Sequence, residues 1–236
     1  EMDIVVICLH PEAAADFVRR QAGRIKAGAL LTDVCGVKRP LFEAVGEVEN
    51  RRFIYLGGHP MAGREGSGIV MSEGVAFDQA NYIIVPTACN TDEGLAAAKK
   101  LGEILGFAQI AELDVDTHDE MIAYLSQLTH CIAVALMTCR DCEHMTAYTG
   151  DSFRDLTRIA RINDEMWSEL FLLNKEKLLA QMDLFIDEIT RMRDLLKKGD
   201  REGLRDMMRR STARRALFDK PVTETPQSII EKENRK

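Results

Sequence analysis

The stretch IVVICLHPEAAADFVRRQAGRIKAGALLTDV, residues 4–34, decides the fold class. It opens with the apolar run IVVICL (4–9), passes through a helical pattern over 11–26, and returns to a strand-like run at 29–34. Strands rich in Val and Ile that alternate with helices are typical of a parallel sheet with both faces covered. The stretch therefore predicts a strand–helix–strand unit of such a sheet.

The same alternation continues through the first half of the chain. Further apolar strand-like runs lie at 53–57, 82–86 and 108–112, and helical patterns lie at 38–47 and 91–105. We therefore expect a sheet that is extended strand by strand to about residue 114.

The second half follows a different pattern. From Asp116 to about Leu217 the sequence has only long amphipathic stretches with apolar residues at helical spacing. We therefore predict an α/β part followed by an all-α part. The first is a partial Rossmann-type nucleotide-binding domain over 1–114, the second a helical substrate and dimerisation domain over 115–218, and a polar tail follows over 219–236.

The run IVVICL (4–9) is apolar on both faces, as a central strand is, and such a strand needs neighbours along both edges. No G-x-G-x-x-G turn follows any strand-like run, and no acidic residue ends a second strand in the dinucleotide pattern. We therefore expect that the opening part of a nucleotide-binding fold is missing and that the sequence is cut from a longer one.

Composition narrows the class of protein. The 236 residues are 46% hydrophobic and 29% charged, with a formal net charge of −7, which argues against a generic nucleic-acid binder. The longest apolar runs are too short to span a bilayer and no export signal is seen, so we expect no membrane partner and a cytoplasmic protein. Six scattered cysteines predict buried, reduced thiols. The one CxxC pair, Cys139 and Cys142, lies in a predicted helix, and we expect no metal site there.

One stretch, GGHPMAGREGSG (57–68), cannot form an ordinary helix or strand interior. It places His59 at the carboxyl end of a strand, where ligands of open α/β sheets bind. Glycine lets backbone approach a ligand closely, and a histidine of near-neutral pKa can take a proton from a hydroxyl. The alternative is a tight structural loop with a capping histidine.

Two other stretches combine charge with an apolar pattern. In TDVCGVK (32–38), Asp33 either contacts a ligand or, as is commoner, caps the following helix. SFRDLTRIARINDEMW (152–167) carries three arginines that suit a carboxylate but are also spaced as on a solvated helix face. His118 and His130 project about 120° apart on a regular helix, so they do not face one pocket squarely. Burial in a core is the simplest interpretation of His130.

Together with THDEMIAYLSQLTHCIAVAL (117–136), these stretches resemble the prephenate/arogenate dehydrogenase family of tyrosine biosynthesis in order and spacing. The resemblance covers nearly the whole chain to about residue 215. It implies a Rossmann domain followed by a helical domain that forms a homodimer. It also implies oxidation of the C4 hydroxyl of prephenate or arogenate by NAD or NADP, with loss of the ring carboxylate as CO2.

The same resemblance implies roles for particular residues. His59 matches the catalytic proton acceptor, and Arg158 in the T-R-I-A motif matches a substrate-binding arginine. The other residues implied for the substrate pocket are His130, Glu65, Ser67 and Trp167. The residues left for the cofactor are those at two strand ends, His10, Pro11, Asp33, Cys35 and Gly36.

One departure from the family concerns the turn at Cys35 and Gly36, where many members carry a serine, so that its hydrogen bond is absent or comes from backbone. Three other interpretations stay open: an arogenate dehydrogenase, a non-catalytic dimerisation fragment, and a β-hydroxyacid dehydrogenase. The last relies on a catalytic lysine, and residues 117–137 contain none.

Overall fold

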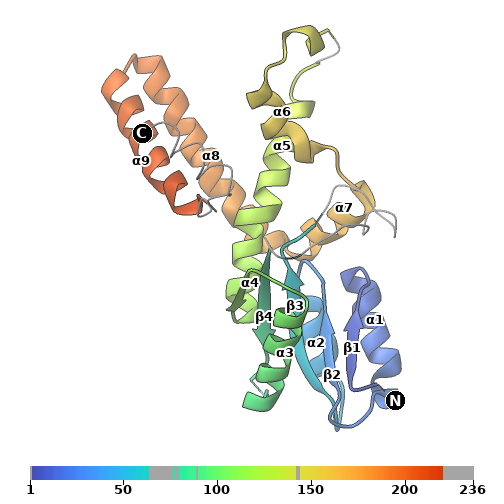
Figure 1. Ribbon diagram of the computed structural model, residues 1–236. Helices are drawn as coiled ribbons and strands as arrows, with labels where there is room; N and C mark the ends of the chain where they lie inside the picture. Colours follow the sequence, from blue (N-terminus) through green and yellow to red (C-terminus); the bar gives the residue numbers. More distant parts are fainter. Residues whose placement is uncertain (1, 64–76, 78–79, 89, 142–143, 220–236) are drawn as a thin grey trace, which may run out of the picture. The chain divides into compact units, whose positions relative to one another are not determined.

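The computed structural model describes residues 2–63, 77, 80–88, 90–141 and 144–219 (Figure 1). The chain divides into two compact units, Glu1–Met182 and Asp183–Lys236. Glu65 and Ser67, which the resemblance assigns to the substrate pocket, lie outside the described residues, as does the predicted polar tail beyond Asp219.

Five strands form one sheet in the order β1-β2-β3-β4-β5. Their bounds are Ile4–Ile7 for β1, Leu30–Asp33 for β2, Ile54–Pro60 for β3, Asn81–Pro86 for β4 and Gln109–Glu112 for β5. All five coincide with strand-like runs of the sequence, so the prediction of a sheet-forming first half is confirmed. Three of the four pairings are parallel, and β3 with β4 is antiparallel.

The predicted parallel sheet is thus confirmed for three of the four pairings, and β4 is the exception because it runs antiparallel to β3. Pro60 at the end of β3 lies opposite Tyr82 near the start of β4, and Met61 N donates to Asn81 O at 2.8 Å. Because β4 starts at the edge where β3 ends, the chain can reverse there without crossing the sheet.

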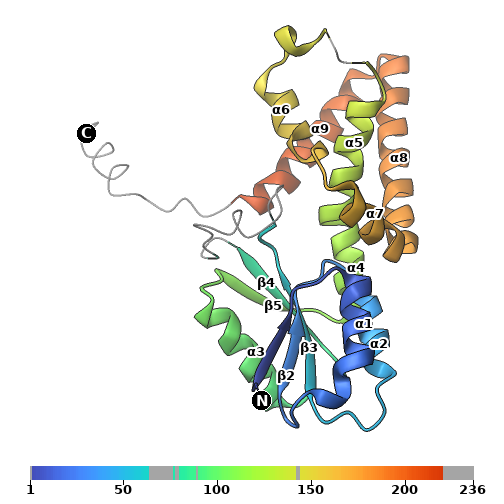
Figure 2. The same cartoon turned by 90° about the vertical axis from the view of Figure 1, so that its right-hand side faces the viewer.

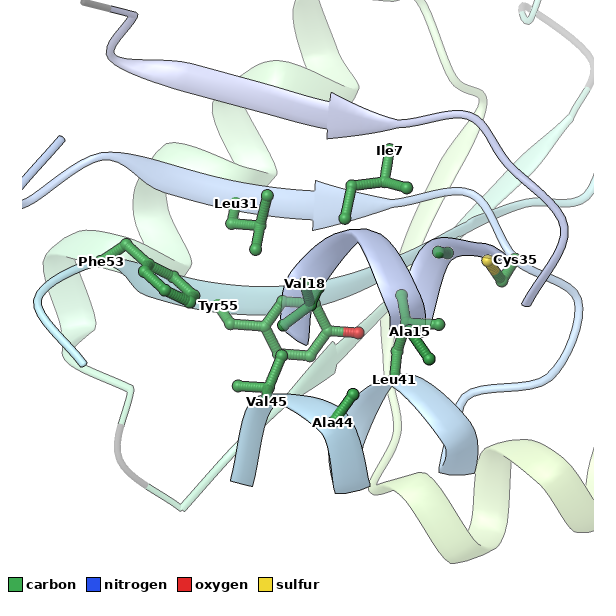
Figure 3. Close-up of a cluster of buried hydrophobic side chains, with 11 residues drawn as sticks. Ile7, Ala15, Val18, Leu31, Cys35, Leu41, Ala44, Val45, Phe53 and Tyr55 are labelled. Atoms are coloured by element: carbon green, nitrogen blue, oxygen red, sulfur yellow. The ribbon is translucent and has the colours of Figure 1, made fainter. Parts of the chain in front are cut away.

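Helices cover both faces of the sheet (Figure 2). On one face, α1 (Pro11–Gln21) and α2 (Arg39–Gly46) enclose a core with β1–β3 (Figure 3). On the other face, α3 (Asp92–Ile104) packs over a second cluster that includes Leu56 and Ile84. The helical patterns of the first half are thus confirmed, with the 11–26 pattern ending in a short 3₁₀ turn, η1 (Ala22–Arg24).

Within the described chain, β1 pairs with β2 alone and forms an edge of the sheet. Ile4 and Val6 are 45% and 44% exposed, although both are apolar. The two-sided burial expected for this run is therefore not seen among the described residues.

The described residues of the second half form helices joined by turns, with no strand among them, as the sequence predicts. Its first segment is continuous and consists of α4 (Val115–Ile122), a π-helical turn η3 (Ala123–Leu128) and α5 (Thr129–Thr138). The remaining elements are η4 (Thr146–Tyr148), α6 (Asp151–Thr157), η5 (Arg158–Ala160), α7 (Asp164–Leu173), α8 (Lys175–Lys198), α9 (Arg201–Arg215) and η6 (Ala216–Phe218).

The segment Val115–Thr138 is, by length and composition alone, long and apolar enough to cross a bilayer. The expectation that every apolar stretch is too short is therefore wrong for this one. Its buried polar residues His118, Asp119 and Gln127 are hydrogen-bonded to other elements of the same compact unit, as in a helix of a folded domain.

The described cysteines differ in burial. Cys35 is buried, but Cys8 and Cys139 are exposed, so the prediction of buried thiols is wrong for those two. Cys139 is the C-cap of α5, which ends at Thr138, so Cys139 does not lie inside a helix as predicted. Cys142 lies outside the described residues.

Candidate active site

His59 lies near the end of β3, directly after a close approach of β3 to β2. A Cβ at Gly58 would lie 2.7 Å from the backbone oxygen of Asp33 and 2.9 Å from Oγ1 of Thr32, distances that side chains do not tolerate. Glycine is therefore required at position 58 to let the two strand ends meet. This packing fixes the backbone that carries the partly buried His59 ring.

The His59 ring is hydrogen-bonded to a second histidine. Its Nδ1 lies 2.9 Å from Nε2 of His118, at the beginning of the helical half. The other nitrogen of His118, Nδ1, lies 2.7 Å from Oδ1 of Asp119. His118 and Asp119 are 0% and 1% exposed, so His59 sits at the outer end of a buried His–His–Asp chain.

Asp119 also holds the start of α2. Its Oδ1 accepts from the backbone N–H of Lys38 at 2.9 Å, and its Oδ2 accepts from that of Arg39 at 3.1 Å. These N–H groups belong to the first turn of α2, whose cap side chain makes no such bond. The carboxylate thus caps α2 from another element and ties α4 to the sheet domain.

A buried ion pair lies behind the same strand ends. Lys38 Nζ donates to Asp33 Oδ1 at 2.5 Å and also to the carbonyl oxygen of Gly58. Asp33 accepts further from Tyr55 OH at 2.9 Å and from the backbone N–H of Cys35 at 2.9 Å. Lys38 and Asp33 have 0% exposed side chains. Asp33 is therefore fully engaged within the protein. The prediction that it caps the following helix is wrong, because α2 begins at Arg39 and its N-cap is Lys38.

Burial lowers the pKa of His59 well below its ordinary range, and the nearby Lys38 and His118 lower it further. The pKa of His118 is also lowered, mainly by burial, although its bond to Asp119 acts in the opposite direction. Both imidazoles are thus neutral near pH 7, and a neutral imidazole can accept a proton.

The residues predicted for the cofactor lie at the carboxyl ends of β1 and β2. His10 is the exposed N-cap of α1 and Pro11 its first residue. A carboxylate from α7 reaches this helix start, because Glu169 accepts from Glu12 N at 2.8 Å and lies 3.3 Å from Nδ1 of His10. Cys35 points inward, donating from Sγ to Leu9 O at 3.4 Å. Burial raises the pKa of its thiol far above the ordinary value.

The described residues among those predicted for the substrate, Arg158, His130 and Trp167, are in the helical half. His130 on α5 stacks on Trp167 of α7, with ring centroids 3.7 Å apart, and its Nδ1 lies 2.8 Å from Ser126 O. Burial lowers the pKa of His130. The structure thus brings His130 and Trp167 together. Arg158 is exposed on η5, which packs against α5 and α6.

Sequence reasoning missed three residues of this site: His118, Asp119 and Lys38. A signal for the first two existed, since adjacent His and Asp at 118–119 open the helical half, and a carboxylate beside an imidazole is a known way to fix the tautomer of a histidine. The sequence carried no such signal for Lys38, because a lysine next to the start of a helix is normally predicted to be exposed.

Comparisons with known proteins agree with this architecture. A family model described as "Prephenate dehydrogenase, nucleotide-binding domain" matches residues 1–110, and one described as "Prephenate dehydrogenase, dimerization domain" matches 114–210. The prephenate dehydrogenase of Bacillus subtilis is 30% identical over 182 residues, which cover 74% of this chain and 48% of that protein. The cyclohexadienyl dehydrogenase of Zymomonas mobilis is 26% identical, covering 92% and 76%. The chain spans about half the length of the Bacillus relative.

Solved structures share the fold. Prephenate dehydrogenase from Aquifex aeolicus superposes with a TM-score of 0.80 at 23% identity, over 92% of this chain and 77% of that one. Arogenate dehydrogenase from Synechocystis superposes with a TM-score of 0.78 at 22% identity, over 92% and 79%. With two adjoining family models matched in order over most of its length, the chain belongs to the prephenate/arogenate dehydrogenase family.

Proposed function

We propose that this protein is an NAD(P)-dependent prephenate dehydrogenase that converts prephenate to 4-hydroxyphenylpyruvate and CO2, with arogenate as the alternative substrate. The observation that carries the proposal is His59. It is a neutral, partly buried histidine at the carboxyl end of a strand, backed by a buried His–Asp pair. Such a group can accept a proton from the substrate's C4 hydroxyl.

The proton of the C4 hydroxyl moves to His59 as the C4 hydrogen leaves as hydride and a carbonyl forms at C4. The bond between the ring and its carboxylate then breaks, CO2 departs, and its electron pair moves into the ring. The C4 oxygen recovers a proton from His59 and becomes a phenol. His59 thus returns to its neutral form within each turnover.

NAD or NADP supplies the hydride acceptor when bound, and the family model that matches residues 1–110 is a nucleotide-binding domain. One Aquifex aeolicus prephenate dehydrogenase structure is in complex with hydroxyphenyl propionate and NAD+. The carboxyl ends of three parallel strands, β1–β3, meet beside His59 in this chain, and that edge is where open α/β sheets bind ligands.

Of the strand-end residues, Gly36 fits a role in approaching the cofactor. A Cβ at Gly36 would meet only Leu170 side-chain atoms, at 3.5 and 3.7 Å, so that neither strand backbone nor a polar group crowds this side of the residue. The side chains of Asp33 and Cys35 are turned inward. We therefore assign the cofactor contacts of this turn to its backbone, together with His10 and Pro11.

For the substrate we keep Arg158, His130 and Trp167 as proposed binding residues. The stacked rings of His130 and Trp167 offer an aromatic surface. His130 contacts Ser126 O through Nδ1, and its other ring nitrogen, Nε2, takes no part in that contact. A guanidinium at Arg158 suits one of the two substrate carboxylates.

The helical part contains a matched dimerisation domain, and we propose a homodimer. Along α8 the apolar side chains of Ile186, Ile189 and Leu196 are 51%, 49% and 62% exposed, and their spacing of three and seven residues places them in one row on the helix. A second copy that covers this row would bury it. Sedimentation of a monomer at assay concentrations would reject the dimer. We also propose the cytoplasm as its location.

The experiment that tests the function is an assay of the purified protein with prephenate or arogenate and NAD+ or NADP+, in which formation of reduced cofactor is followed. Turnover of neither substrate with either cofactor would reject the proposal.

Two variants separate chemistry from binding. His59→Asn is expected to lower kcat by roughly 10²–10⁴-fold, the usual contribution of a positioned general base, with little change in KM. Arg158→Ala is the contrasting variant. It is expected to raise KM by about 30-fold, from about 2 kcal/mol of lost charge pairing, with kcat nearly kept. An unchanged kcat in His59→Asn would remove His59 from the proton transfer.

A further inference from the structure

The buried chain behind His59 has a defined hydrogen-bond direction. Asp119 accepts from the backbone N–H groups of Lys38 and Arg39, at 2.9 and 3.1 Å, in addition to the contact with His118. An ionised carboxylate can only accept. At 2.7 Å from this carboxylate, Nδ1 of His118 must therefore be the nitrogen that carries a proton.

The proton on Nδ1 of His118 determines the tautomer of His59. A neutral imidazole with hydrogen on Nδ1 has its lone pair on Nε2. Nε2 of His118 therefore accepts in the 2.9 Å bond, and Nδ1 of His59 must donate. The remaining nitrogen of His59, Nε2, is then left with its lone pair free for an incoming proton.

This assignment requires a neutral His118, and its surroundings favour that state. The side chain is 0% exposed, and burial is the largest cause that lowers its pKa. Among the charged groups that act on it, Lys38 also disfavours the cation, whereas Asp119 and Asp33 favour it. Since Asp33 is paired with Lys38, and Asp119 is engaged by two backbone N–H groups, burial prevails.

We propose that His118 and Asp119 are positioning residues for His59. They hold it in the tautomer whose Nε2 accepts the substrate's proton, and they share the positive charge that His59 then acquires. The source of that proton rests on the proposed function, but the tautomer itself does not.

The charge-sharing step follows from the same chain. When Nε2 of His59 takes a proton, the bond from its Nδ1–H to His118 becomes charge-assisted and strengthens. The carboxylate of Asp119 lies one imidazole away, so it offsets a charge that burial and Lys38 would otherwise oppose. The His118–Asp119 pair therefore stabilises His59 most after proton transfer, when His59 is charged. Stabilisation of that charged state accelerates the reaction.

The tautomer can be measured directly, without substrate or cofactor. Protein labelled with ¹⁵N-histidine is studied by long-range ¹H–¹⁵N correlation near pH 7.5, and the ring signals are assigned with the single variants His59→Asn and His118→Gln. The expected result is a proton on Nδ1 of both His59 and His118. A proton on Nε2 of His59 overturns the proposal.

Two substitutions of His118 test its action through His59. His118→Gln places an amide oxygen near the position of Nε2, so it can still accept from His59. His118→Phe offers no acceptor. We expect Nδ1–H of His59 to persist in the Gln variant and to be lost in the Phe variant. Gln127→Leu is the matched control, because it removes a buried polar group of the same helical segment that bonds to Leu170 and Asn174 instead.

Kinetics supply the second readout. His118→Phe should lower kcat by roughly 100-fold, the lower end for general-base catalysis, with KM changed little, and His118→Gln should recover part of that loss. The Gln127→Leu control should keep both the tautomer and kcat. Equal kcat losses in the Phe, Gln and control variants would show a merely structural role and overturn the proposal. Correct tautomers in a protein that turns over neither substrate would reject the proposed function alone.

Discussion

Lys38 is the residue on which the carboxyl edge of the sheet depends. Its ammonium joins Asp33 at the end of β2 to the carbonyl of Gly58 in β3, and its backbone N–H is held by Asp119 of α4. Three elements thus meet at one buried cation, one residue away from His59. A buried ion pair of this kind adds little net stability when intact, but its loss leaves an uncompensated charge.

We therefore predict that Lys38→Met destabilises the fold by about 3–5 kcal/mol, the usual cost of removing one partner of a buried ion pair. The carboxylate of Asp33 would keep only Tyr55 OH and Cys35 N as donors. Urea unfolding followed by circular dichroism measures the change. The double variant Lys38→Met/Asp33→Asn, which carries no buried charge at this place, should be more stable than Lys38→Met. A double variant that is less stable would contradict this account.

At this scale the sequence could place His59 but not its partners. A strand-like run that ends in two glycines and a histidine indicates a strand-end site, and the structure has His59 in β3. His118 is 59 positions away along the chain. Only tertiary packing brings α4 against β3, and the pattern of a helix does not show which side chains from elsewhere it will meet.

The π-helical turn η3 is the feature of the helical half that sequence periodicity did not reveal. The expected 120° between His118 and His130 assumes a regular α-helix, whereas Ala123–Leu128 between them winds more widely. The two histidines do make different contacts, with His59 and with Trp167. Polar side chains hold this turn in place. Gln127 donates from Nε2 to Leu170 O at 2.8 Å and accepts from Asn174 Nδ2 at 2.9 Å.

Gln127→Leu is accordingly predicted to destabilise the fold by about 1–3 kcal/mol, because it leaves the buried Leu170 carbonyl and one amide contact of Asn174 unsatisfied. Thr129→Ala is a control in the same segment. Thr129 is exposed and bonds only within the helix, so this change should stay within about 0.5 kcal/mol. Chemical denaturation measures both variants. Equal stability of the two would show that the Gln127 bonds do not stabilise the turn.

The strands and helices were predictable because their apolar periods are local properties of the chain. The reversal at β4 was not, since a strand's apolar pattern is the same whichever way its neighbour runs. Pairing direction and strand order belong to the tertiary structure.

On the scale of the whole molecule, we propose that function divides near residue 114, with nucleotide binding before it and substrate binding and dimerisation after it. The first compact unit nevertheless runs to Met182. The bonds of His118 and Asp119 to His59 and Lys38 account for this, since they join the start of the helical half to the sheet. His59, the proposed catalytic histidine, and its proposed positioning pair therefore come from the two sides of the proposed boundary.

Because these histidines are neutral and shielded from solvent in the folded protein, the free energy of unfolding should fall in mild acid. The folded-state pKa values of His59, His118 and His130 lie below the ordinary value of 6.5. Below about pH 6.5 the unfolded chain therefore binds protons that the folded chain does not, and the free energy of unfolding falls by up to about 1.4 kcal/mol per pH unit for each buried histidine. Aspartates with lowered pKa, such as Asp114 and Asp116, act only below about pH 4 and do not enter this window.

Urea unfolding at pH 7.5, 6.5 and 5.5 (about one pH unit apart) should then show constant stability above about pH 6.5 and a progressive loss below it. In His118→Gln one titrating group is removed. The fall in the free energy of unfolding between pH 6.5 and 5.5 should therefore be smaller in this variant, by up to about 1.4 kcal/mol. A stability that holds unchanged down to the lowest pH would mean that both rings accept protons in the folded state. That outcome would contradict the lowered pKa values of His59 and His118 on which this prediction rests.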